Sequence, residues 1–216
     1  PVRITGRGFG QVRVFLVDAL TLETRSWVAS VRPGQRTIPV PIRVVGNTRF
    51  GNDLEYAIGM KAIRGTVIGD FLGMATVTDD DPAPTFTVEP VADTVAEGGT
   101  LRWRLTISEP ADIEMYASGT AQPPTGGGPE LSTTDVDPDW LFEVASEFAE
   151  PSRPLSSILL EPWTVIAPGD LTGEITVPTS TDDAAEPAER IELALRGSGR
   201  EIQEIGTVTG TVTNAP

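Results

Sequence analysis

The 216-residue sequence contains no cysteine and no histidine. Without these residues the chain cannot form a disulfide, a zinc site of the Cys/His type, or a catalytic triad that relies on histidine. Any bound metal must therefore have oxygen ligands, which favours calcium or magnesium. The sequence also lacks a run of about 18 apolar residues, so it predicts no membrane-spanning helix and no membrane insertion.

The chain carries a formal net charge of −15, and its acidic residues are concentrated in the second part. Residues 1–82 contain 10 basic and 8 acidic side chains, whereas residues 83–216 contain 6 and 23. An acidic surface repels nucleic-acid phosphates, so we expect no nucleic-acid partner. The charge leaves two alternatives, which are cation binding and simple solubility.

Apolar and polar residues alternate with period two, which is typical of half-buried strands. The alternating segments are Gln11–Val17, Leu101–Ile107, Glu174–Val177, Arg190–Leu195 and Gly206–Thr213. Turn residues separate them, so the pattern predicts an antiparallel sandwich. Residues 122–162 depart from this pattern, and we interpret them as a long insertion with limited structure and a short helix around Asp139–Glu147.

The sequence contains an internal repeat. Trp27, Pro33-Gly34 and Ile38–Pro41 match Trp163, Pro168-Gly169 and Ile175–Pro178, and a polar loop and two strands follow each set. The repeat predicts two domains, 1–82 and 83–216, joined near residues 79–84. The second copy has additional strands before its tryptophan, so the first domain is partial. An unpaired sheet edge there can accept another strand.

Several short motifs follow one another in a fixed order. They are Glu97-Gly98, Gly119-Thr120-Ala121, Asp139-Trp140, Pro168-Gly169-Asp170, the acidic loop Asp182–Glu186 and, in the first repeat, Thr78–Asp81. This series resembles the Calx-beta domain family, over residues 84–214 as a whole domain and over 27–82 as a partial one. Such domains occur in the cytoplasmic regulatory region of sodium–calcium exchangers, in integrin beta-4 and in secreted or surface bacterial proteins.

The resemblance implies an all-β chain of two antiparallel Ig-like/Calx-beta β-sandwiches in tandem. It also implies Ca²⁺ as the cofactor, held at one end of a sandwich by the Glu-Gly turn, the acidic loop and the closing aspartates. The candidate ligands are Glu97, Asp182, Asp183 and Glu186 in the second domain, and Asp79, Asp80, Asp81 and the facing Asp53 in the first. The sequence departs from the family at Ser118 and Asn214, where the site expects aspartates. A solvated acidic loop is the alternative for both sets.

Two other features allow a functional interpretation. The segment Asp135–Asp139 resembles the start of an EF-hand calcium loop but lacks its glycine and distal glutamate, so we expect structural hydrogen bonds there. The tryptophans allow a carbohydrate platform, but Trp103 and Trp163 lie in strand patterns, which favours core packing.

We therefore predict a non-catalytic structural or adhesive module of a secreted or cell-surface bacterial protein, located outside the cell. Calcium at the joint between the domains would stiffen it. The expected partners are other domains of the same parent chain or neighbouring subunits. Three alternatives stay open: a calcium-responsive regulatory module, a ligand-binding accessory part of a larger secreted enzyme, and an assembly subunit completed by strand addition.

Overall fold

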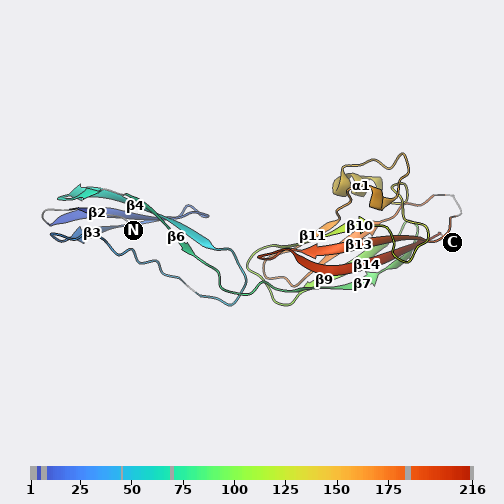
Figure 1. Ribbon diagram of the computed structural model, residues 1–216, viewed down its shortest axis with the longest axis horizontal. Helices are drawn as coiled ribbons and strands as arrows, with labels where there is room; N and C mark the ends of the chain where they lie inside the picture. The colour runs from blue at the N-terminus through green and yellow to red at the C-terminus, as the bar shows by residue number, and fades with distance from the viewer. Residues whose placement is uncertain (1–3, 6–8, 45, 69–70, 183–185, 215–216) are drawn as a thin grey trace. The chain divides into compact units, whose positions relative to one another are not determined.

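The computed structural model describes residues 4–5, 9–44, 46–68, 71–182 and 186–214. The chain divides into two compact units, which are unit 1, Pro1–Asp81, and unit 2, Pro82–Pro216. Antiparallel sheets dominate both units, so the predicted all-β antiparallel class is confirmed (Figure 1). In the described part of the chain, no helix is long and apolar enough to cross a membrane.

Unit 2 is a sandwich of two sheets. The five-stranded sheet has the order β11-β10-β13-β14-β8 and the three-stranded sheet has the order β12-β9-β7. Among the named strands of the described residues, every pairing in unit 2 is antiparallel except that of β14 with the short strand β8. The strands are β7 Phe86–Ala92, β8 Thr94–Ala96, β9 Thr100–Ile107, β10 Met115–Gln122, β11 Trp163–Ile166, β12 Thr172–Pro178, β13 Glu189–Gly197 and β14 Gln203–Thr213.

The core of unit 2 lies between these two sheets. The predicted alternation in β9 is confirmed, because Leu101, Trp103, Leu105 and Ile107 are all buried. Gly210 of β14 faces them, and a Cβ atom there would lie 2.7 Å from Leu101 Cδ1 and 3.0 Å from Trp103 Cζ2. The sheets therefore approach so closely at this point that only glycine fits without displacement.

Trp163 does not share this core, so its predicted core packing is wrong. It is the first residue of β11 and is 55% exposed, whereas Trp103 is 1% exposed. In β11 the residues that turn inward are Thr164 and Ile166. Trp163 therefore points to the outer side of an edge strand, because alternate residues of a strand face opposite sides.

The insertion at 122–162 is more ordered than the sequence predicts. It contains the helix α1, Pro138–Ala145, and the 3₁₀ turn η1, Leu155–Ser157. The Asp137 carboxylate caps α1 by accepting hydrogen bonds from the N–H groups of Asp139 and Trp140. The insertion buries five apolar side chains, which anchor it to the sandwich: Leu131, Val136, Leu141, Leu155 and Leu160.

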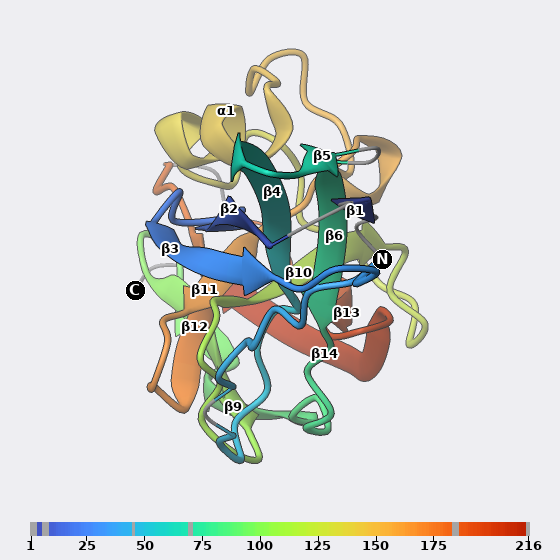
Figure 2. The same ribbon diagram turned by 90° about the vertical axis from the view of Figure 1, so that its left-hand side faces the viewer.

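Unit 1 has a four-stranded antiparallel sheet with the order β3-β2-β4-β6. Figure 2 shows β4 and β6 side by side in this sheet. A separate pair joins β1 to β5. The strands are β1 Ile4–Thr5, β2 Gly10–Asp18, β3 Thr24–Val31, β4 Leu54–Arg64, β5 Val67–Ile68 and β6 Leu72–Val77. A small core gathers on one face of the sheet around Val12, Val14, Val31 and Met60.

The internal repeat does not extend to every element. Ile38–Pro41 forms no strand, whereas its counterpart Ile175–Pro178 belongs to β12. Prolines at 39 and 41 have no backbone N–H to donate, which disfavours pairing in a sheet. Ile38 and Val40 still pack against the core of unit 1. The segment thus covers the sheet as an extended chain.

Candidate metal centre

Acidic side chains from four segments gather at one end of unit 2. Glu97 lies in the turn between β8 and β9, Asp135 in the insertion, Asp182 and Glu186 in the loop between β12 and β13, and Glu189 begins β13. Backbone hydrogen bonds hold these segments together. The N–H of Ser180 donates to the carbonyl of Asp135 at 2.9 Å, and the N–H of Gly98 donates to the carbonyl of Ser180 at 3.1 Å.

The Glu97-Gly98 turn has a specific reason for its glycine. Gly98 has a φ of 76°, in the left-handed region that favours glycine. A Cβ atom there would also lie 2.6 Å from the Thr181 methyl group. The turn therefore packs directly against the loop that carries Asp182, and this contact brings Glu97 toward the other acidic residues.

Three carboxylates of this end form the centre of the group, and we call Asp135, Glu186 and Glu189 the unit 2 cluster. One oxygen of each lies within 4.8 Å of the others. Asp135 and Glu189 are half-buried, whereas Glu186 is exposed. Asp135 comes from the insertion, about 50 residues before Glu186 and Glu189 in the chain, so the full cluster exists only in the folded protein.

Local hydrogen bonds fix Asp135. Its carboxylate accepts the N–H of Ser132 at 2.6 Å and the hydroxyl of Thr134 at 3.3 Å. Its backbone carbonyl accepts from Ser180, and the next residue, Val136, pairs with Thr179. These contacts attach the insertion to the end of β12, which explains why a residue of the insertion reaches the site.

The cluster raises the pKa values of its glutamates. Burial raises the pKa of Glu189 to about 8, together with the charge of Asp135, a hydrogen bond to its carboxyl group, and the charges of Glu186 and Glu97. Burial also raises the pKa of Glu186, with contributions from Asp135, Asp182 and Glu97. Removing water and placing like charges together both disfavour the ionised form. Near neutral pH, the arrangement therefore favours a proton or a cation.

The structure brings some of the predicted unit 2 residues together and adds two. Glu186 belongs to the cluster, and Glu97 and Asp182 lie close enough to affect its pKa, whereas Asp183 falls outside the described residues. Asp135 and Glu189 were not among the ligands predicted from the sequence. The EF-hand-like segment gave a signal for Asp135, but nothing in the sequence alone indicates that Glu189 begins its strand at the acidic end.

Ser118 does not bear on this cluster. It pairs with Arg196 in the ladder of β10 and β13, whereas Glu189 is the first residue of β13. Seven residues along a strand correspond to roughly 23 Å. A carboxylate at position 118 would thus lie far from the cluster, and the departure from the family pattern there removes no ligand from it. Asn214 does lie near, because its side-chain oxygen accepts the N–H of Glu186 at 3.2 Å.

The predicted residues of unit 1 also come together. Carboxylate oxygens of Asp79, Asp80 and Asp81 lie within 4.8 Å of one another. The Asp79 carboxylate accepts from the N–H of Gly51 at 2.7 Å, and the Asp53 carboxylate accepts from the N–H of Asp79 at 2.9 Å. The carboxylates of Asp53 and Asp79 thus have a structural role, because their hydrogen bonds hold the loop before β4 next to the end of β6.

The chain is similar to several solved structures, all at low sequence identity. No family model matches the sequence, and no curated protein matches it. The apo-form Calx CBD1 domain shares 13% identity over 61% of this chain and 98% of its own, with a TM-score of 0.37. CBD12 from CALX1.2 shares 11% identity over 95% and 88%, with a TM-score of 0.38. The calcium binding domain CBD12 of CALX1.1 shares 10% identity over 95% and 87%, with a TM-score of 0.31.

Proposed function

We propose that this chain is a non-catalytic module that binds Ca²⁺ at the unit 2 cluster. The observation that carries the proposal is the convergence of Asp135, Glu186 and Glu189 within 4.8 Å; burial, together with these neighbouring charges, raises the pKa of Glu189 to about 8. Such a group of carboxylates is stabilised when a cation neutralises it. The fixed orientation of Asp135 provides one ligand that is already in place.

The spacing of the cluster suits a single calcium ion. Calcium binds oxygen at about 2.3–2.6 Å, so two ligands on opposite sides of the ion lie roughly 4.8 Å apart. The three carboxylates already lie within this distance of one another. Glu97, Asp182 and the side-chain oxygen of Asn214 lie around the same loops and can complete the oxygen shell.

The unit 1 aspartates are the weaker candidate for the same role. Asp53 and Asp79 accept backbone hydrogen bonds that hold the loop before β4, as Asp135 accepts one in unit 2, so these bonds do not distinguish the two sites. The cluster at Asp79–Asp81, however, draws its carboxylates from adjacent residues of one segment. Neighbouring surface aspartates are readily solvated, which requires no ion.

The broader biological role rests on the ordered motifs of the sequence. We propose a Calx-beta-like structural or adhesive module in a secreted or cell-surface protein, with calcium stiffening the loops at the end of unit 2. The lack of cysteine and histidine supports a non-catalytic role because it excludes the common nucleophile–base pairs. A calcium-responsive regulatory module is the second candidate. The raised pKa of Glu189 favours it, because the protonation state of this side chain would change when calcium binds.

Thermal unfolding with calcium and with a chelator tests the proposal. A ligand that binds only the folded state, at a hundredfold excess over Kd, adds about 2.7 kcal/mol to the free energy of unfolding. We expect calcium to raise the Tm of the unmodified chain and of Asp80→Asn, which alters only the unit 1 aspartates. Glu189→Gln and Asp135→Asn should lose most of the shift. No shift at millimolar calcium, or a shift lost only in Asp80→Asn, would overturn the assignment.

A further inference from the structure

The edge strand β3 of unit 1 has an unpaired side. Within the described residues, β3 pairs only with β2. The N–H of Asp18 donates to the carbonyl of Glu23 at 3.0 Å, which makes these two a hydrogen-bonded pair of the ladder. Hydrogen-bonded and non-hydrogen-bonded pairs alternate along antiparallel strands. Ser26, Val28 and Ser30 therefore direct their N–H and C=O groups away from β2, toward a further strand.

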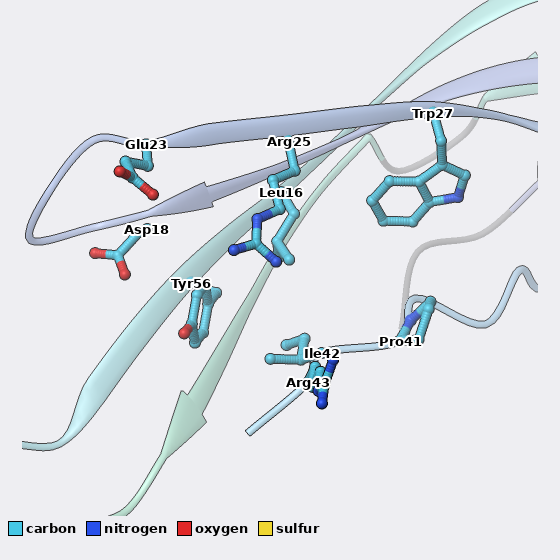
Figure 3. A pocket seen from close by; sticks show the side chains of 9 residues that line it. All are labelled: Leu16, Asp18, Glu23, Arg25, Trp27, Pro41, Ile42, Arg43 and Tyr56. Atoms are coloured by element: carbon cyan, nitrogen blue, oxygen red, sulfur yellow. The ribbon is translucent and has the colours of Figure 1, made fainter. Parts of the chain in front are cut away.

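Residues 38–43, which we call the covering segment, pack over the sheet of unit 1. The side chains of β3 adjoin a hollow beneath this segment. This hollow has a volume of about 360 Å³ and is lined by Arg25 and Trp27 of β3, Tyr56 of β4, and Ile42 and Arg43 of the covering segment. In Figure 3 the side chains of Arg25 and Trp27 point from β3 toward the covering segment at 41–43. A strand added beside β3 would place alternate side chains at this opening.

A second hollow continues along the same strand. Its volume is about 680 Å³, and its lining includes Trp27, Ala29 and Ser30 of β3 and the covering residues Ile38 and Pro39. Trp27 lines both hollows, so they adjoin one another along β3. Because Pro39 and Pro41 lack N–H groups, the covering segment is poorly suited to pair with β3 itself. The edge thus combines free backbone groups with space for the side chains of an incoming strand.

The two hollows, which we together call the groove, are lined by three arginines and two acidic residues, and this excess of positive charge favours an acidic occupant over a basic one. Arg25 and Arg43 line the first hollow and Arg32 lines the second, and none of the three side chains forms an ion pair with another described residue. Of the two acidic residues at the first hollow, Asp18 stays ionised, because its carboxylate accepts the N–H groups of Thr21 and Leu20 at 2.9 Å and these bonds lower its pKa. The other, Glu23, lies near Asp18 at the hairpin end (Figure 3).

We infer that the free edge of β3 is a docking site for an extended acidic peptide segment of another protein. The segment adds a strand to the sheet, and its backbone pairs with Ser26, Val28 and Ser30. Its carboxylates meet Arg25, Arg32 and Arg43 along the groove. Backbone pairing provides affinity in this kind of recognition, and the side-chain sites beside the strand provide selectivity. The inference is independent of calcium binding in unit 2.

A labelled peptide of eight residues, the length of β3, tests the inference with the full chain. In the probe, valine and glutamate alternate; one control replaces glutamate by lysine and another replaces alternate residues by proline. Fluorescence anisotropy should show saturable binding of the acidic probe and about tenfold weaker binding of both controls. The proline control cannot pair as a strand, which separates strand addition from simple charge attraction.

Substitutions in β3 locate the binding to its edge. Val28→Pro removes one outward N–H and leaves the pairing with β2 intact, so it should weaken binding at least about tenfold, whereas Val28→Ala should bind like the unmodified chain. If Val28→Pro does not fold, as judged by circular dichroism, Ser30→Pro and the double variant Arg25→Glu/Arg43→Glu take its place. Unchanged binding in a folded proline variant, or no binding up to about 1 mM probe, would overturn the inference. Self-association of the unmodified chain that Val28→Pro abolishes would instead assign the edge to a second copy.

Discussion

Unit 1 and unit 2 contain equally regular antiparallel strands, but they bury very different amounts of apolar surface. Among the described residues, six hydrophobic side chains are buried in unit 1 and 21 in unit 2. Unit 2 has two facing sheets and an insertion packed against them, whereas unit 1 has one four-stranded sheet covered by an extended segment. A second sheet, rather than strand regularity, therefore determines how much core a unit can form.

The two units also differ in how their acidic clusters are assembled. The unit 2 cluster joins Asp135 of the insertion to Glu186 and Glu189, which lie where the loop after β12 enters β13, at the end of a closed sandwich. In unit 1 the aspartates are neighbours in the chain, and Asp79 is tied to the loop at Gly51. A closed sandwich can thus bring distant carboxylates together and remove them partly from water, which raises their pKa values.

The largest expected effect on the free energy of unfolding comes from replacing a tryptophan of each unit by alanine. Trp103 is almost fully buried between the sheets of unit 2, so Trp103→Ala should lower the free energy of unfolding by about 3–5 kcal/mol. Trp27 is only half-buried, and Trp27→Ala should cost clearly less. Urea unfolding followed by circular dichroism measures both. Equal losses would contradict the difference in closure between the units.

A smaller effect is expected from adding one methyl group to a strand glycine of each unit. In unit 2, Gly210→Ala places a Cβ atom against the buried Leu101 and Trp103, so it should cost about 1–3 kcal/mol. In unit 1, the nearest atom to a Cβ at Gly59 is Phe15 Cβ at 3.9 Å, so Gly59→Ala should be neutral or stabilise by about 0.4–1 kcal/mol. Similar destabilisation at both sites would indicate that unit 1 is packed as tightly as unit 2.

The helix cap in the insertion should contribute less again. Asp137→Ala removes the acceptor for the N–H groups of Asp139 and Trp140 and should cost about 1 kcal/mol. The insertion carries Asp135, so this variant should also weaken calcium binding. Asp139→Asn, which keeps the cap, is the matched control and should change both quantities little. A full calcium response in Asp137→Ala would show that the insertion does not position the site.

The smallest effect is the pH dependence of stability in a chelator. The ordinary pKa of Glu189 is 4.5 and its folded value is about 8, so the folded chain retains a proton that the unfolded chain loses. The free energy of unfolding should therefore fall as pH rises from about 4.5 to 8 and then become level. The partial exposure of Glu189 keeps this change small. The slope should decrease in Glu189→Gln, and an equal slope in both proteins would exclude Glu189 as its source.

Local patterns in the sequence predicted more of the fold than of the site. Period-two alternation placed the strands around Val14, Trp103 and Leu193, because one buried face imposes that pattern. The sequence did not reveal that Ile38–Pro41 remains unpaired, since alternation persists there although the prolines disfavour pairing. The exposure of Trp163 also depends on which strand lies at a sheet edge, which the residues of β11 do not encode.

The candidate site depends on contacts between distant segments, and this limits its prediction. Glu97, Asp182 and Glu186 were found through motifs that lie in order along the chain. Asp135 belongs to the site only because Val136 pairs with Thr179, and Glu189 only because β13 begins at that end of the sandwich. The predicted joint role of Asp53 and Asp79–Asp81 as calcium ligands stays a prediction, beside the structural hydrogen bonds that these residues form.

Proton release during calcium titration tests the central claim most directly. Because its folded pKa is about 8, Glu189 is mostly protonated at pH 7, and it must lose that proton to bind a metal. Calorimetric titration in two buffers of different ionisation enthalpy should report about one proton released per calcium at pH 7, decreasing toward zero at higher pH. Asp80→Asn, which leaves the unit 2 cluster unchanged, should release the same amount. Calcium binding to the unmodified chain without proton release, or no binding at all, would contradict the account.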